Sequence, residues 1–280
     1  RDVLGSRGLG DVYKRQGDPL NGNMPRVTYE GYGEMSDVCI KRKIRNRLLD
    51  AGENIFVQSD DKNTDGYKSL KARAEANEAF GAELKNGKKA DAQRGYEIAC
   101  KEWMDVRSFG QVFAFKGSDL SLGIRGPVSV QPAFSVDPID ITSMQITKSV
   151  NSEDKEGKSS DTMGMKHRVD FGVYILKGSI NVQLSEKTGF TEEDAEKIKE
   201  AIRTLFVNDS SSARPDGSMV MHKLYWWKHN CKIGQYSSHK VHNSIEIKKK
   251  EGVRNPRKIE DYEIICHELP GLAVEEYEGL

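Results

Sequence analysis

A run of basic residues is the first feature of this sequence that could carry chemistry. The segment KRKIRNR at residues 41–47 holds five basic residues in seven, and Arg26 lies upstream in a Gly-rich loop. Lysine and arginine bind phosphate groups without reading base identity, and backbone N–H groups of such a loop can also meet phosphates. Lys41, Lys43, Arg45 and Arg26 are therefore the first candidates for binding a nucleic-acid backbone. An ordinary solvated helix face explains the same charge run.

Two further cations stand in distinctive surroundings. Arg125 lies in GIRGP, where the flanking glycines permit close approach of the backbone to a ligand, although a plain turn fits equally well. Arg107 lies in DVRSFGQVFAF, an alternating segment that predicts a strand over residues 105–115. From there it could bind phosphate or form a structural ion pair.

The segment 144–168 predicts a protruding hairpin with a polar tip, NSEDKEGKSSD, at residues 151–161. Met144 and Met163 could wedge against bases, since inserted apolar side chains unstack nucleotides at modest cost. Lys166 and His167 could hold phosphate beside them. Packing within the hairpin is an equally good interpretation of the methionines.

Stacking and metal chemistry have weaker signals. The aromatic run Tyr225–Trp227 could stack bases, but consecutive strand residues face opposite ways, and core packing fits it better. The spacing HxC…HxxH, formed by His229, Cys231, His239 and His242, matches no strong zinc pattern. No Walker loop, GxSxG, HExxH or GxGxxG motif is evident. We predict neither a metal nor a cofactor.

The composition is typical of a cytoplasmic protein without a membrane span. The 280 residues have a mean hydropathy of −0.66, and 43 basic residues balance 43 acidic ones. No apolar run approaches the length of a membrane-spanning helix. The four cysteines are scattered and form no CxxC pair, which suits a reducing compartment: Cys39, Cys100, Cys231 and Cys266.

Local patterns predict an alternation of helices and strands. One clear helix begins at Ser36 or Asp37 and ends at Gly52. Another runs from Thr191 to Phe206, and its Thr191 and Asp194 resemble a capping box. Other expected helices cover 70–84 and 92–103. Expected strands cover 54–59, 105–115, 127–136, 144–150, 169–184, 219–228 and 241–248.

The order of these elements fits an α+β palm. With one additional strand before Ser36, the core order becomes βαββαβ, the ferredoxin-like arrangement that RNA-recognition (RRM-like) modules also use. Residues 1–16 have no hydrophobic period, and SRGLGDVYKRQ at 6–16 looks like a translated sequencing adapter. We therefore expect the native protein to begin upstream of Gly17, with its first strand missing here.

Several colinear blocks resemble the backbone subunit of type I-C CRISPR Cascade complexes, a branch of the Cas-seven family in the RAMP superfamily. They are GDPLNGNMPR (17–26), SDVCIKRKIRN (36–46), DVRSFGQVFAF (105–115), GIRGPVSVQPAFSVDPI (123–139), TMGMKHRVDFGVY (162–174), the stretch 188–217 and LYWWKHNCKIG (224–234). The resemblance covers the chain from about Gly17 to its end and is least distinctive over 53–101.

The resemblance implies a single RRM-like backbone domain over 17–280. A finger is inserted at about 53–104, and a thumb hairpin lies at about 140–168. Family members polymerise along a CRISPR guide RNA and leave its bases free to pair with target DNA. The implied partners are copies of the chain, the large subunit and the subunit that caps the guide 5′ end.

An alternative is an endoribonuclease on the same fold. His167 could then act as a general base, or Asp154 and Asp161 could support metal-assisted cleavage. The type I-C resemblance instead implies a non-catalytic subunit.

Overall fold

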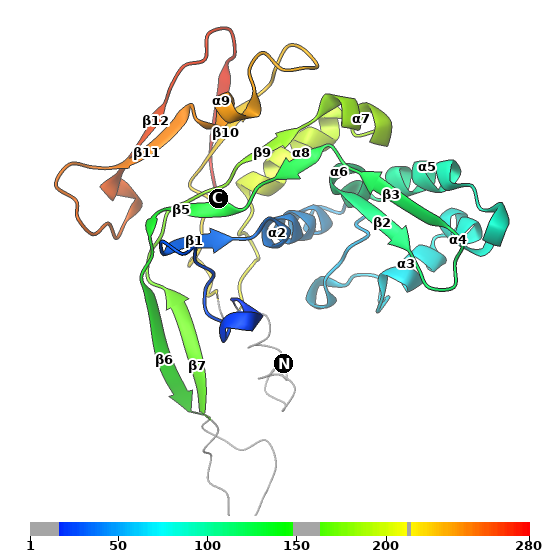
Figure 1. The fold of residues 1–280 in the computed structure, drawn as a ribbon, viewed down its shortest axis with the longest axis horizontal. Coiled ribbons are helices and arrows are strands. Elements are labelled where there is room, and N and C mark those ends of the chain that lie inside the picture. Colours follow the sequence, from blue (N-terminus) through cyan, green and yellow to red (C-terminus); the bar gives the residue numbers. More distant parts are fainter. Residues whose placement is uncertain (1–16, 148–162, 212–213) are drawn as a thin grey trace, which may run out of the picture.

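The protein has a mixed helix-and-strand fold. The computed structural model describes residues 17–147, 163–211 and 214–280. A central body carries a helical lobe on one side and a long hairpin that points away from it (Figure 1). The expected adapter (1–16), the polar tip of the hairpin, Asp154 and Asp161 lie outside the described residues.

Two long helices form where local signals predict them. Helix α2 (Asp37–Asp50) is capped by Ser36, whose hydroxyl accepts the Cys39 N–H at 3.4 Å. Helix α8 (Glu192–Arg203) begins at a capping box in which Thr191 and Asp194 bond each other's backbone N–H groups. Caps and helical periodicity are local properties of a sequence, and this is why both helices could be predicted.

Helices α2 and α8 build the first hydrophobic core. Ile40, Ile44 and Leu48 of α2 pack with Ile198 and other α8 residues over strands β4 (Val128–Val130) and β5 (Ala133–Pro138). Strand β5 is the centre of an antiparallel sheet, between β1 (Tyr32–Met35) and β8 (Tyr174–Ile175). Strand β4 pairs with β9 (Gly178–Ile180), which leads to helix α7 (Val182–Thr188).

A single ferredoxin-like palm sheet stays a prediction. Strand β10 (Lys223–Trp227) follows α8 along the chain, but its partner among the described residues is β13 (Val274–Glu278) rather than the β1–β5–β8 sheet. Between them lie helix α9 (Ser238–His242) and an antiparallel pair formed by β11 (Ile245–Lys249) and β12 (Tyr262–Cys266). The described strands thus form one three-stranded sheet and several two-stranded ones.

A second core fills the helical lobe. It gathers α3 (Leu70–Ala76), α4 (Glu78–Lys85), α5 (Ala92–Glu102), α6 (Met104–Phe109) and the antiparallel pair β2 (Gly110–Ala114) and β3 (Ser121–Arg125). The rings of Phe56, Phe80, Trp103 and Phe113 meet at its centre, with centroids 4.7–6.1 Å apart. This core extends to Ile124, and the finger expected at about 53–104 stays a prediction.

Several predicted strands were wrong in type or extent. Residues 105–109 are helical, and the chain turns into β2 at Gly110 (φ +82°), where a Cβ atom would lie 2.2 Å from the Ile124 carbonyl oxygen. The strand predicted over 169–184 is broken into β8 and β9 with gaps around them, and it gives way to α7 where Asn181 accepts the Leu184 N–H. Likewise, Val241 belongs to α9.

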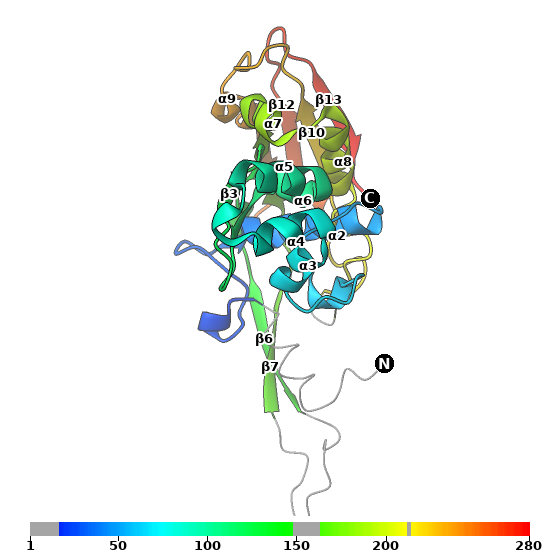
Figure 2. The same ribbon diagram turned by 90° about the vertical axis from the view of Figure 1, so that its right-hand side faces the viewer.

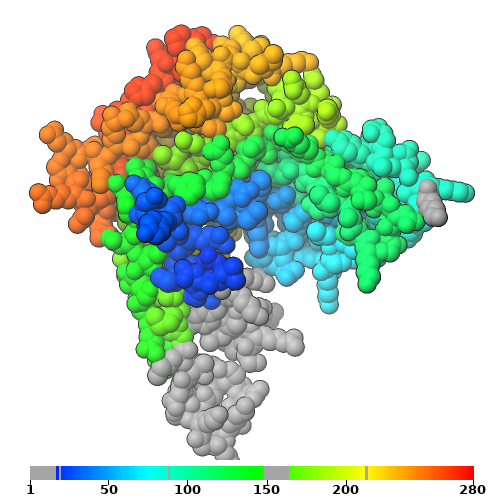
Figure 3. All heavy atoms as spheres, viewed as in Figure 1, coloured from blue at the N-terminus to red at the C-terminus, as the bar shows by residue number. Residues whose placement is uncertain are grey.

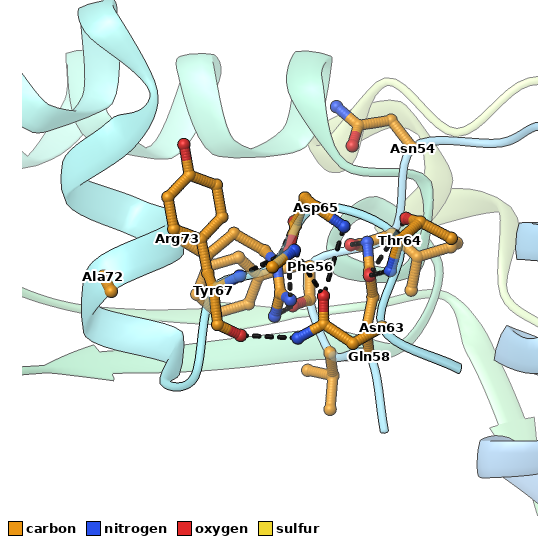
Figure 4. Close-up of polar contacts among 12 residues, drawn as sticks. Asn54, Phe56, Gln58, Asn63, Thr64, Asp65, Tyr67, Ala72 and Arg73 are labelled. Carbon is orange, nitrogen blue, oxygen red and sulfur yellow. Dashed lines mark hydrogen bonds and ion pairs between the residues drawn. The ribbon is translucent and has the colours of Figure 1, made fainter. Parts of the chain in front are cut away.

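The predicted strand at 54–59 is an irregular segment held by polar contacts (Figure 4). Arg73 forms a two-pronged ion pair with Asp65, at 2.6 and 2.8 Å, and donates to the Phe56 carbonyl oxygen. Asn63 donates to the Tyr67 carbonyl oxygen at 2.6 Å. Arg73 thus gives the Phe56 carbonyl oxygen the donor that a neighbouring strand would have supplied.

The hairpin consists of β6 (Ile141–Thr147) and β7 (Met163–Val169). The two strands pair antiparallel along their whole described length, from Ile141 opposite Val169 to Thr147 opposite Met163. Figure 2 shows that they leave the body and point away from both cores.

One buried carboxylate joins the two cores. Asp105 is fully buried and accepts hydrogen bonds from the Phe56 and Val57 N–H groups, at 2.7 and 3.1 Å. It also pairs with Arg45 of α2, with Nε 2.9 Å from Oδ2. Helix α2 of the first core, the irregular segment and helix α6 of the second core therefore meet at this group.

We predict that Asp105→Asn lowers the free energy of unfolding by about 3 kcal/mol, because it removes one partner of a buried ion pair. Denaturant unfolding followed by circular dichroism measures the change. The matched control is Asp119→Asn, an exposed aspartate of the same lobe, which should stay within about 0.5 kcal/mol of the parent. Equal stability of the two variants would contradict the junction role.

Candidate nucleic-acid interface

A large groove runs along helix α2. Its volume is about 1810 Å³, which exceeds typical small-molecule pockets. Helices α2 and α8, the segment 167–182 and strand β10 line it. Basic side chains outnumber acidic ones in the lining: Arg26, Arg42, Lys43, Arg168, Lys177, Arg214, Lys223, Lys228 and Lys232 against Glu34, Asp170, Glu192 and Glu196.

Three of the predicted RNA-binding residues line this groove: Arg26, Lys43 and His167. Arg26 lies in the N-terminal segment, which Figure 3 shows in blue beside the hairpin in green. Its guanidinium group lies 3.7 Å from the Asp18 carboxylate. Because the Arg26 side chain is 45% exposed, the cation stays accessible in spite of this pair. Arg42, one residue before Lys43, also lines the groove and forms an exposed pair with Asp61 at 2.7 Å.

Lys43 is part of a buried charge cluster rather than a free surface cation. Its ammonium group pairs with Asp209, which also accepts from Arg214 at 3.3 Å. Burial lowers the pKa of Lys43, and the hydrogen bond to Asp209 opposes that effect. Two cations thus share one carboxylate, which leaves the cluster with a net positive charge next to the groove.

The basic run of α2 does not form one binding surface. Lys41 pairs with Asp37 at 3.0 Å, and Arg45 is held by Asp105 and lies over the Phe109 ring at 4.9 Å. Neither residue lines the groove. The guanidinium group of Arg45 is used inside the fold, and RNA binding by this residue stays a prediction. Residues two apart on a helix point in nearly opposite directions, so Lys43 could not share a face with them.

Arg107 is also used inside the fold. It lies on helix α6 rather than on a strand, and its guanidinium group makes a two-pronged pair with Asp194 of α8, at 2.9 and 2.8 Å. Of the two roles predicted for it, the structure supports the ion pair. Burial alone would raise the pKa of Asp194, but hydrogen bonds from Arg107 and Thr191 outweigh it and lower the pKa overall.

Arg125 lies outside the groove, at the end of β3. It is exposed and follows a tight backbone crossing, where a Cβ on Gly126 would lie 2.3 Å from the Ser108 carbonyl oxygen. The glycine therefore serves backbone packing at this point. The Arg125 side chain stays accessible to a ligand at the lobe surface.

The hairpin residues divide between two faces. Directly opposed residues of an antiparallel pair share a face, so Met144 and Lys166 lie together, with Ile146 on the same side. Met165 and His167 lie on the other side, where the His167 Nδ1 is 2.8 Å from the Ser143 hydroxyl. Met144, Ile146 and Met165 are 37–45% exposed. Met163 pairs with Thr147 through the backbone.

The aromatic run has a split role. Tyr225, Trp226 and Trp227 all line the groove, and the rings of Tyr225 and Trp227 stack with centroids 6.2 Å apart. Lys199 of α8 lies over the Trp226 ring at 5.5 Å, which ties that ring to the body.

Within the described residues, no group of three or more His, Cys, Asp or Glu side chains could hold a metal ion.

Arg42, Lys177 and Arg214 were missing from the predicted site. Arg42 lay inside the basic run, and helix phase could have selected it together with Lys43. Lys177 and Arg214 lie in irregular segments with no local motif, so only the fold brings them to the groove.

Comparison with known proteins gives the family. A family model described as CRISPR-associated protein Cas7 matches residues 14–267. The chain belongs to the Cas7 family. A Cas7 protein of Haloferax volcanii is 22% identical over 213 residues, which make up 70% of this chain and 61% of that relative. The match therefore spans under two thirds of the relative's length.

A chain from a solved CRISPR RNA-guided surveillance complex, in a pre-nicking state, is also similar. It is 16% identical, with a TM-score of 0.43 and coverage of 71% of this chain and 69% of that chain. Within the described part of the Cas7-family chain, no helix combines the length and apolarity needed to cross a bilayer.

We predict that Arg107→Met lowers the free energy of unfolding by about 3 kcal/mol at neutral pH, because Asp194 stays charged without its partner. The native pKa of Asp194 is depressed, so its stabilising effect is present above the ordinary carboxylate pKa and disappears as pH falls through the native value. The deficit of the variant should therefore shrink toward pH 3. Urea unfolding at pH 7 and pH 3 measures it, and a deficit that does not change with pH would refute the assignment.

Proposed function

We propose that this chain is the RNA-binding backbone subunit of a type I-C Cascade complex. In this proposal it binds the sugar-phosphate chain of a CRISPR guide RNA and leaves the base edges free to pair with target DNA. The observation that carries the proposal is the basic groove beside α2, in a chain of the Cas7 family. The role is non-catalytic and cytoplasmic.

The charge on the groove suits a phosphate chain. Arg26, Arg42 and Arg168 are 45–59% exposed, and each pairs with an equally accessible or half-buried aspartate. Exposed ion pairs contribute at most about 1 kcal/mol, so phosphate groups can replace the aspartates at low cost. Phosphate contacts carry no base information, which is what a subunit repeated along a variable guide requires.

The hairpin supplies a second kind of contact. Met144 and Ile146 are partly exposed on one face, with Lys166 beside them. Apolar side chains next to a cation can separate stacked bases while the cation holds the neighbouring phosphate. We propose that this face displaces one base of the guide where the hairpin crosses it.

Assembly follows from the same scheme. A groove open to solvent lets the RNA continue from one copy to the next, so copies of the chain are the first partners. The large subunit and the subunit that caps the guide 5′ end complete the proposed complex.

We predict that the triple variant Arg26→Ala, Arg42→Ala, Arg168→Ala weakens binding to single-stranded RNA equally for unrelated sequences. Loss of three phosphate contacts should reduce the slope of log K against log salt by about 2. Fluorescence anisotropy over a salt series measures both quantities. The control is Lys101→Ala, Lys116→Ala, Lys250→Ala, which removes the same charge from exposed positions outside the groove. Equal losses in both variants would overturn the groove as the binding site.

A separate prediction concerns the hairpin. Met144→Ala with Ile146→Ala should weaken RNA binding by about tenfold without changing the salt slope, because unstacking contacts release no counterions. In RNA that carries 2-aminopurine, the variant should also lose the fluorescence rise that unstacking produces. Met165→Ala, on the opposite face, is the control. A larger effect of that control than of the double variant would contradict the face assignment.

A further inference from the structure

The direction of the hairpin is set at its root. Strands β6 and β7 pack chiefly on each other, and beyond the root they stand clear of the cores (Figure 2). A seven-residue strand is about 23 Å long, so a tilt of about 20° at the root moves the far end by about 8 Å. Contacts at the root therefore control where the exposed apolar side chains of the hairpin lie.

The C-terminal pair β11–β12 holds this root through two aspartates. Asp137, at the end of β5, pairs with Lys249 at 2.9 Å and accepts a hydrogen bond from the Tyr262 hydroxyl at 2.8 Å. Asp140, directly before β6, pairs with Arg257 at 3.1 Å. All three partners come from β11, β12 and the loop that joins them, more than 100 residues further along the chain.

The contact at Asp137 is the stronger of the two. The Tyr262 side chain is buried, and its ring stacks on Phe171, at the foot of β7, with centroids 6.5 Å apart. Burial and the neighbouring Asp137 raise the pKa of Tyr262, so its hydroxyl stays a donor. The side chains of Asp140 and Arg257 are 71% and 56% exposed, and such a pair contributes little.

The opposite side of the root is held by backbone pairing and by the Ser135 hydroxyl. Strand β1 pairs with β5, and the Ile139 N–H donates to the Gly31 carbonyl oxygen at 3.0 Å. The Ser135 hydroxyl donates to the Asp137 carbonyl oxygen at 2.6 Å. The root is thus fixed between β1 and the β11–β12 pair, and the latter contact is made by charged and hydroxyl side chains.

We propose that the β11–β12 pair is a brace that fixes the direction of the β6–β7 hairpin through Lys249 and Tyr262 on Asp137. These are positioning residues: they act through Asp137 and reach no ligand themselves. The brace also sets the interval at which successive copies cover an RNA, a consequence that rests on the proposed function.

The test compares Lys249→Met, Tyr262→Phe with the parent chain by pulsed electron paramagnetic resonance. Spin labels are attached at Met165→Cys on the hairpin and Lys101→Cys on α5, with Cys39, Cys231 and Cys266 changed to Ser. Cys100 is retained, because burial raises the pKa of its thiol to about 11 and suppresses labelling. We expect a narrow distance distribution in the parent and one at least twice as broad in the double variant.

The matched control is Lys248→Met, which removes a neighbouring charge that pairs with Glu246 within β11. Its distribution should stay as narrow as that of the parent. Tyr262→Phe alone keeps the ring on Phe171 and should broaden the distance distribution by a smaller amount. If circular dichroism shows that the double variant is unfolded, the distance distribution of this single variant tests the brace instead. An unchanged distribution in the folded brace variant overturns the brace.

A nuclease footprint on long single-stranded RNA tests the consequence for spacing. The parent and Lys248→Met should protect the RNA at a regular interval, and the double variant should lose that regularity. A regular interval in a variant with a broadened hairpin would overturn the link to spacing. Failure of the parent to bind RNA would overturn the proposed function, and the distance measurement would still report on the brace.

Discussion

The arrangement of the two cores depends on the contacts that the Asp105 carboxylate makes with Arg45 and with two backbone N–H groups. The carboxylate lies without solvent exposure between helix α2, the irregular segment at Phe56 and helix α6. A buried charge is tolerated only when it is paired and hydrogen-bonded, and here Arg45 and two backbone N–H groups meet that requirement. The Arg107–Asp194 pair makes a second connection, to helix α8. These charged contacts, together with apolar residues such as Met104 of α6 that pack in the first core, fix the direction of the lobe relative to helices α2 and α8.

This arrangement divides the cations of the chain into two groups. Arg45 and Arg107 hold elements together, and Lys43 is largely taken up by Asp209. The pairs of Arg26 with Asp18 and of Arg42 with Asp61 are exposed and lie at the groove. Cations of the second kind are suited to exchange an aspartate for a phosphate. Net charge therefore says little about which cations of this protein could meet a ligand, because the fold decides which of them stay accessible.

The sequence predicts what is encoded locally and misses what depends on distant partners. Caps and periodicity predict α2 and α8, and the strands of the hairpin are found where alternation and a polar tip indicated them. The switch from α6 to β2 at Gly110 was missed because the alternating pattern of 105–115 fits a strand as well. The partners of Arg45 and Lys43 are 60 and 166 residues away, so a single sequence gave no sign that either was already taken. The groove, in turn, is assembled from segments with no shared motif.

The separation of the two hydrophobic cores has a consequence for how the molecule opens. Each core buries its own set of side chains, and helix α6 contributes to both, with Met104 in the first core and Val106 in the second. Such a molecule has subglobal units that can lose their structure one at a time. The amides of the helical lobe then exchange their hydrogens through openings in which α2 and α8 stay folded. Substitutions or changes of length within the lobe accordingly destabilise the lobe first, while helices α2 and α8 keep their geometry.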